Sequence, residues 1–84
     1  MMSKDSIKHL LAFLEEKYPN SVADTESLKK AAPPQVNKDD LYRILFFCWE
    51  ERFINCTPVE ESGRVADFYN IRITSAGIRY LRDI

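Results

Sequence analysis

The chain has 84 residues, of which 45% are hydrophobic and 30% are charged. This balance is typical of one folded domain and excludes a disordered chain. The formal net charge of -1 excludes an overall attraction to phosphate or anionic lipid, so a contact with nucleic acid would need a local basic patch. No stretch approaches the roughly 20 apolar residues of a membrane span, and the first residues do not resemble a signal peptide. We therefore expect a single domain over residues 1–84, in a cytoplasmic protein that contacts no membrane.

The first expected element is an amphipathic helix over residues 3–18, which Ser3 caps and Pro19 ends. Its apolar residues recur at helical spacing: Ile7, Leu10, Leu11, Leu14 and Tyr18. A short second helix follows, capped by Asp24 or Thr25 and stopped by Pro33 and Pro34.

The third expected helix starts at Asn37, because a cap residue followed by two acids is typical of a helix N-terminus. Its pattern favours an inward face of Leu41, Leu45 and Trp49. The outward face is then expected to carry Asp39, Arg43, Phe47 and Glu50.

After this helix the pattern changes to two β-prone stretches, residues 53–59 and 66–74, which predict a hairpin with Ser62 and Gly63 at its tip. Thr74 or Ser75 then caps a last short helix. We expect its inward residues to be Ile78, Leu81 and Ile84, and its exposed residues to be Arg79 and Arg82.

The expected fold class is α+β: three helices, a two-stranded hairpin and a short C-terminal helix. This order is the winged variant of the helix-turn-helix motif. The segment 41–54 is similar to the long third helix and first wing strand of winged-helix proteins. The segment 73–81 resembles the Leu-Thr-x-x-Gly-x-x-Tyr-Leu ending of small bacterial and phage-associated members of that superfamily. The resemblance covers about half the chain, residues 41–81, and speaks for the fold more than for function.

Arg52 departs from that resemblance, because winged-helix proteins commonly have Gly at the end of the third helix. A residue other than Gly in the left-handed region costs on the order of 1 kcal/mol. Either Arg52 bears this cost, or the helix ends differently and runs on toward Phe53.

The inventory of reactive residues disfavours an enzyme. His9 is the only histidine and is expected on the polar side of the first helix. Cys48 and Cys56 are interpreted as buried small hydrophobes without a disulfide, and their spacing matches no common zinc site. With two glycines, Gly63 and Gly77, the chain has no Gly-rich phosphate loop. We expect no catalytic centre, cofactor, metal or small-molecule substrate.

The resemblance implies binding to double-stranded DNA and a role in transcription regulation or another DNA transaction. The acids of the third helix oppose this, because like charges repel phosphates. The candidate DNA-binding residues, for which plain solvated surface is the alternative, are Lys29, Lys30, Gln35, Asn37, Lys38, Arg43, Arg64 and Arg72.

A protein interface is the competing hypothesis. Adjacent aromatics cannot both point into one narrow core face, and an exposed aromatic cluster marks a partner surface. The candidate interface residues are Tyr42, Phe46, Phe47 and Phe53. Phe47 is expected to be covered by another chain, most simply in a homodimer. The alternative is that the hairpin and the last helix cover the cluster.

Overall fold

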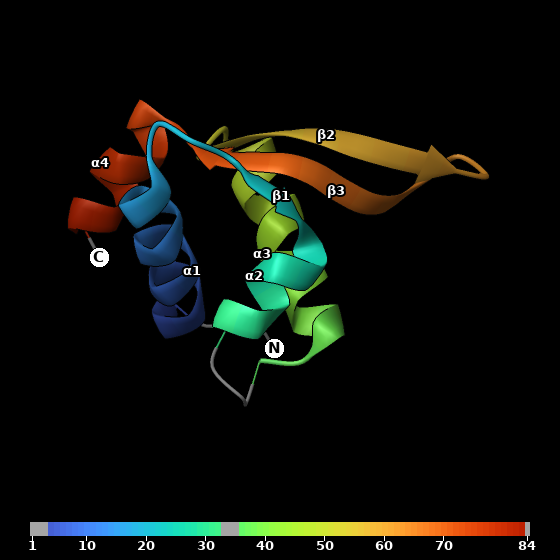
Figure 1. The fold of residues 1–84 in the computed structure, drawn as a ribbon, viewed down its shortest axis with the longest axis horizontal. Coiled ribbons are helices and arrows are strands. Elements are labelled where there is room, and N and C mark those ends of the chain that lie inside the picture. Colours follow the sequence, from blue (N-terminus) through green and yellow to red (C-terminus); the bar gives the residue numbers. More distant parts are fainter. Residues whose placement is uncertain (1–3, 33–35, 84) are drawn as a thin grey trace.

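The computed structural model describes residues 4–32 and 36–83, and these form an α+β fold with four helices and a three-stranded antiparallel sheet (Figure 1). The residues named above as caps, stops or contacts at positions 3, 33, 34, 35 and 84 lie outside the described residues. The elements in chain order are α1 (Lys4–Lys17), β1 (Val22–Asp24), α2 (Thr25–Ala31), α3 (Lys38–Glu50), β2 (Ile54–Glu61), β3 (Arg64–Ile73) and α4 (Ser75–Asp83).

The sheet has three strands in the order β1-β3-β2, whereas the sequence predicted only the two strands of the hairpin. Val22 pairs with Ile71, and Asp24 pairs with Tyr69. Strand β1 has three residues and no alternating pattern of its own. It is a strand because β3 offers it hydrogen-bonding partners, and such a long-range pairing leaves no local signal in the sequence.

The β2–β3 hairpin has the expected tip. Glu61 pairs with Arg64, and the two residues between them have positive φ, 53° at Ser62 and 77° at Gly63. Two consecutive residues in that region make a type I′ turn, whose twist matches that of the flanking strands. Both strands reach closer to the tip than expected, and the hairpin extends beyond the helices (Figure 1).

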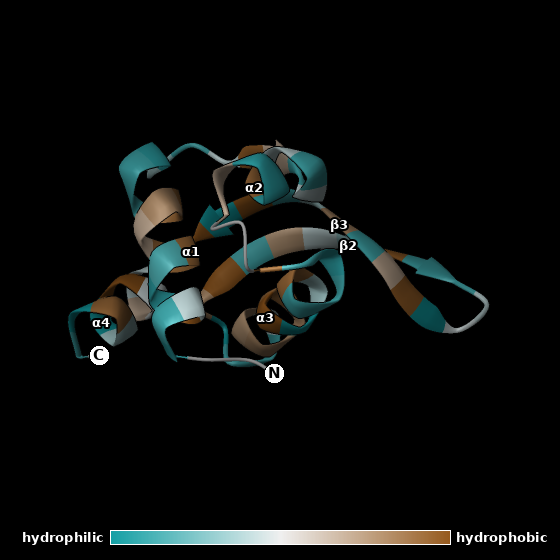
Figure 2. Cartoon of the chain, turned by 90° about the horizontal axis from the view of Figure 1, so that it is seen from below, coloured by the Kyte–Doolittle hydropathy of each residue, from teal (hydrophilic) through white to brown (hydrophobic). Residues whose placement is uncertain are grey.

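Helices α2 and α3 lie against one face of the sheet, α1 and α4 lie at the end away from the hairpin tip, and the core fills the space between these elements (Figures 1 and 2). Strand β3 supplies the sheet side of this core with its buried Phe68, Ile71 and Ile73. The helices contribute fully buried leucines, among them Leu11 and Leu45. Helix α4 lies beside α1, where the guanidinium of Arg82 donates two hydrogen bonds, of 3.1 and 2.7 Å, to the carboxylate of Glu15. This pair raises the pKa of Arg82.

Three of the expected helix caps are confirmed. The Asp24 carboxylate accepts from the backbone N–H of Ser27 at 2.9 Å, and this bond and the Ser27 hydroxyl lower the pKa of Asp24. The Asn37 side chain accepts from the N–H of Asp40 at 2.8 Å. For α4 the cap is Thr74, whose hydroxyl accepts from the N–H of Gly77 at 3.0 Å.

Arg52 takes the left-handed conformation, with φ of 63°. Its N–H donates to the carbonyl of Trp49 at 3.1 Å, and the N–H of Phe53 donates to the carbonyl of Cys48 at 2.8 Å. These two bonds are the Schellman arrangement that usually has glycine at this position. Of the two outcomes considered from the sequence, the helix therefore ends here and Arg52 bears the conformational cost.

Candidate functional site

The solvent-facing side of α3 carries Asp39, Arg43, Phe46 and Glu50, a set called the α3 face below; all four are exposed. Phe46 is 40% exposed, whereas Phe47 is half-buried. The expectation that Phe47 belongs to the outward face is therefore wrong. The inward side is centred on Ile44 and Cys48 as well as Leu41 and Leu45. Because the helix is rotated in this way, Phe46 points outward instead of Phe47.

A band of aromatic rings connects the α3 face to the sheet. The ring of Phe46 meets that of Trp49 edge-on with centroids 5.7 Å apart, and Trp49 meets the buried Phe68 of β3 at 6.1 Å. Tyr42, one turn before Phe46 on α3, has its ring centroid 6.3 Å from that of Phe68. These contacts hold Trp49 and Tyr42 half-buried at the flank of the α3 face, and they fix the direction in which Phe46 points outward.

Phe47 and Phe53 form a separate pair on the opposite flank of α3. Their centroids are 6.1 Å apart, and Phe53 stacks on Tyr80 of α4 at 4.3 Å. All three rings pack against the hydrophobic core. Phe47 therefore obtains part of its cover within the monomer, which corrects the argument that its burial required a second chain. The four aromatics proposed from the sequence are divided between two sides of α3.

A polar hollow of about 390 Å³ lies between α2, α3 and β3. One oxygen of Asp67 accepts from the hydroxyl of Thr25 at 2.8 Å, from the hydroxyl of Tyr42 at 3.3 Å and from the N–H of Phe68 at 2.8 Å. From the sequence, Thr25 was considered only as a helix cap, and Asp67 was missed. The available signal was an acid between Ala66 and Phe68 in the returning strand, where a partly buried carboxylate needs hydrogen-bond donors.

Two of the predicted DNA-binding lysines, Lys29 and Lys38, line this polar hollow. The ammonium of Lys38 lies 5.8 Å from the centre of the Tyr42 ring. Glu26 and Asp67 line the same hollow, so the two cations face two carboxylates. The hollow is consequently not a basic site.

The remaining candidates for DNA contact are dispersed. Arg64 is exposed at the hairpin tip and Lys30 is exposed on α2. The side chain of Asn37 is used as a helix cap, and Gln35 lies outside the described residues. Arg72 lines a different hollow, with Asn20, Ser21, Asn55 and Asn70 among its neighbours. The described candidates are therefore spread over α2, α3 and the hairpin, and they do not share one hollow.

The exposed charges from the start of α3 to the hairpin tip are nearly balanced. The exposed bases are Lys38, Arg43, Arg52 and Arg64, and the exposed acids are Asp39, Glu50, Glu51, Glu60 and Glu61. Four cations against five anions give this surface no excess of positive charge. A phosphate backbone would meet repulsion as well as attraction here.

Both cysteines are free thiols. Burial raises the pKa of the Cys48 thiol to about 12 and that of the half-buried Cys56 to about 11, so neither is an activated nucleophile. Cys48 is buried as expected, whereas Cys56 is buried only in part. Among the described residues, no group of three or more His, Cys, Asp or Glu side chains could hold a metal ion.

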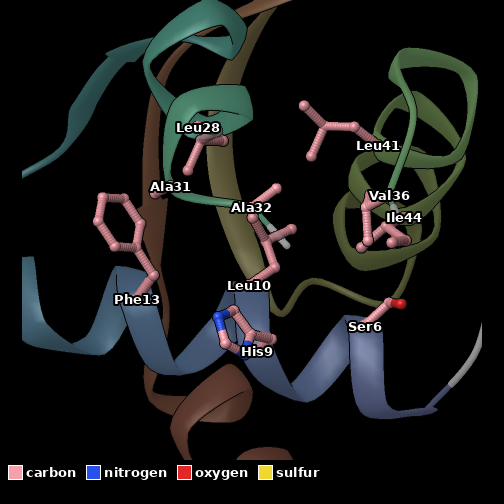
Figure 3. Close-up of a pocket in the computed structure, with 10 residues that line it drawn as sticks. All are labelled: Ser6, His9, Leu10, Phe13, Leu28, Ala31, Ala32, Val36, Leu41 and Ile44. Carbon is pink, nitrogen blue, oxygen red and sulfur yellow. The ribbon is translucent and has the colours of Figure 1, made fainter. Parts of the chain in front are cut away.

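An apolar cavity lies between α1, α2 and α3, with His9 and Phe13 on its α1 side and Leu28 and Leu41 across from them (Figure 3). Its volume of about 10 Å³ is that of about one water molecule. His9 is exposed, as expected from its position on α1. This cavity is too small to hold a substrate.

Within residues 4–32 and 36–83, none of the helices has the length and apolar character needed to cross a bilayer. No protein-family model matches the sequence, and no curated protein or solved structure is recognisably similar to the chain.

Proposed function

We propose that this chain is a non-enzymatic winged-helix module that binds another protein through the α3 face. The order of the elements supports the winged-helix part of the proposal, because α2 and α3 precede a hairpin that extends from the body of the molecule. In the helix-turn-helix motif the outer surface of the recognition helix makes the contact with the partner, which is DNA. In this chain that surface is the α3 face.

The observation that carries the proposal is the exposure of Phe46. Its ring is 40% exposed at the centre of the α3 face, with charged residues of both signs around it. A large aromatic surrounded by a polar rim is the composition of a protein-binding hot spot, where burial of the ring supplies affinity and the rim excludes water. Trp49 extends the apolar surface beside it.

The experiment places a photoreactive benzoylphenylalanine at position 46 in the cells that make the protein, with the same amino acid at the exposed position 16 of α1 as the matched control. We expect protein adducts from position 46 and not from position 16. Adducts with DNA, or no adduct at all, would overturn the proposal.

Duplex DNA is a second candidate, favoured by the cations at the start of α3 and the hairpin tip, Lys38 and Arg64, together with Arg43 on the α3 face. DNA binding would make a role in transcription regulation the natural consequence. It requires an affinity that falls steeply with salt and is weakened in Lys38→Ala and Arg64→Ala. A fluorescent duplex that forms no complex with the protein at low salt would exclude this candidate.

A further inference from the structure

The charges of the α3 face, together with Arg52 just beyond the helix, alternate in sign about Phe46. Asp39 and Arg43 precede it, and Glu50 and Arg52 follow it, so the order is negative, positive, ring, negative, positive. At about 100° per residue, the four members of the α3 face lie within roughly 60° of one another around the helix. Arg52 lines a shallow hollow together with Phe46, Trp49 and Glu50, which places it on the same surface.

None of the four charged side chains is paired within the described part of the chain. Asp39, Arg43, Glu50 and Arg52 are all exposed, and no salt bridge or side-chain hydrogen bond joins any of them to another described residue. Each is consequently free to meet an opposite charge on a partner.

If two copies of this pattern are placed side by side in opposite directions, each charge lies opposite a charge of the other sign. At a rise of about 1.5 Å per residue, Arg43 precedes Phe46 by about 4.5 Å and Glu50 follows it by about 6 Å. Asp39 precedes Phe46 by about 10.5 Å. Arg52 lies two residues beyond the last residue of α3, on the C-terminal side of Phe46. A two-fold axis through Phe46 therefore brings Arg43 opposite Glu50 of the other copy at nearly matching height. The same axis brings Asp39 to the end of the other helix, where Arg52 lies on the same surface as Phe46.

We infer that the partner of the α3 face is a second copy of this chain, with the two α3 helices packed antiparallel. In this arrangement Phe46 meets Phe46 of the second copy at the axis, Arg43 faces Glu50 of the second copy, and Asp39 faces Arg52 of the second copy. Each pair occurs twice, as an isologous interface requires. A parallel arrangement in the same register would set like charges against each other. The inference rests on the proposed function and names its partner.

The affinity of the proposed dimer is limited by the small area of its interface. Stable interfaces bury about 1,200–2,000 Å² in total, and one pair of 13-residue helices is small beside that. We therefore expect a dissociation constant in the micromolar range or weaker. Sedimentation velocity has to cover concentrations from about 10 μM to about 1 mM, a range chosen to bracket such weak association.

The decisive test reverses charges. In the proposed dimer, position 43 of each copy faces position 50 of the other. The Arg43→Glu homodimer therefore has two carboxylates facing each other at both contacts, and the Glu50→Arg homodimer has two guanidinium groups facing each other at both. Each variant alone is expected to dimerise about 10- to 30-fold more weakly, since two exposed ion pairs become two repulsions. Mixed together, the two variants restore both attractive contacts. A heterodimer is therefore expected with an affinity close to that of wild type.

The double variant R43E/E50R supplies a second rescue, because its homodimer again sets opposite charges against each other. Lys8→Glu on the outer side of α1 is the matched control and should dimerise as wild type does. Far-UV circular dichroism checks that each variant is folded.

A wild type that stays monomeric at 1 mM overturns the inference, and so does a dimer whose affinity is unaffected by the single reversals or is not rescued in the mixture. These failures are distinguishable from failure of the proposed function. If position 46 crosslinks to a different protein, the module still binds through the α3 face but its partner is not a second copy.

Discussion

The hydroxyl of Thr25 donates a hydrogen bond of 2.8 Å to the carboxylate of Asp67, which joins the first residue of α2 to the middle of β3 across 42 positions of sequence. The same oxygen of Asp67 accepts from the hydroxyl of Tyr42 on α3. One carboxylate thus holds two helices and the hairpin in a fixed relation. The direction in which the α3 face points depends on this relation.

Removing the hydroxyl of Thr25 should destabilise the fold. Thr25 is 7% exposed, so Thr25→Val keeps the shape of a buried side chain and deletes a hydrogen bond to an ionised group. We expect the free energy of unfolding to fall by about 1.5–3 kcal/mol, measured by urea denaturation. Thr57→Val on the exposed side of β2 is the matched control, for which a change within about 0.5 kcal/mol is expected. Equal effects in both variants would contradict this role of the Thr25–Asp67 bond.

Arg52→Gly should stabilise the protein. Arg52 has φ of 63°, a conformation that costs an L-residue on the order of 1 kcal/mol and costs glycine nothing sterically. Part of this gain is lost to the greater freedom of glycine in the unfolded chain, so we expect a net gain of about 0.5 kcal/mol. Arg79→Gly inside α4 is the control and should destabilise by about 1 kcal/mol. Thermal unfolding at low concentration measures both, and a loss of stability in Arg52→Gly would count against the prediction.

Local signals account for the parts of the fold that were predicted from the sequence. The Asp24 and Asn37 caps and the Ser62–Gly63 tip each depend on bonds or dihedral angles within a few residues, and each is confirmed. Strand β1 depends on pairing with β3, nearly 50 residues away, and has no local pattern.

The candidate site was harder to predict for the same reason. Phe46 and Phe47 are neighbours with equal hydrophobicity, and a small rotation of α3 decides which one is exposed. That rotation is set by contacts of Trp49 with Phe68 and of Phe47 with Phe53, which only the folded chain displays. Asp67 was missed because its partners, Thr25 and Tyr42, lie on two other elements.

Gly77→Ala should be strongly destabilising. A Cβ at this position would overlap the backbone carbonyl oxygen of Phe53 and would lie 2.7 Å from a side-chain carbon of Ile73. Because backbone cannot move aside cheaply, we expect a loss of about 2–3 kcal/mol in urea denaturation. Gly63→Asn is the control, since Asn tolerates the left-handed conformation and no atom lies within 4 Å of a Cβ there. A Gly77→Ala variant as stable as Gly63→Asn would show that α4 packs less tightly against residue 53.

The buried thiol of Cys48 should make stability depend on pH in the alkaline range. Its pKa rises from 9.0 to about 12 on folding, so above about pH 9 the unfolded chain loses a proton that the folded chain retains. The thiol therefore favours unfolding increasingly as pH rises above 9 and has no effect below about pH 8. Cys48→Ala removes this dependence. We expect the difference in unfolding free energy between wild type and Cys48→Ala to be constant from pH 6 to 8 and to shift against wild type above pH 9. If the unfolding free energies of wild type and Cys48→Ala differ by the same amount at every pH from 6 to above 9, the pH dependence does not come from the Cys48 thiol.

Phe46→Ala should mainly weaken self-association, whereas Phe47→Ala should mainly destabilise the monomer. Phe46 is 40% exposed and lies at the centre of the α3 face, so its removal should change the monomer's unfolding free energy by less than about 1 kcal/mol. It should weaken self-association by about 2 kcal/mol or more, because an aromatic at the centre of an interface commonly contributes that much.

Phe47 is half-buried against Phe53 and the core, so Phe47→Ala should cost the monomer about 1–3 kcal/mol, less than the loss for a fully buried ring. Its effect on association should be smaller than that of Phe46→Ala, because its ring packs on the flank of α3 away from the proposed two-fold axis. Urea denaturation of dilute samples measures the first quantity, and sedimentation across a concentration series measures the second. If Phe47→Ala instead abolished association while leaving the monomer's stability unchanged, the outward side of α3 would be centred on Phe47 in solution and the antiparallel pairing about Phe46 would be wrong.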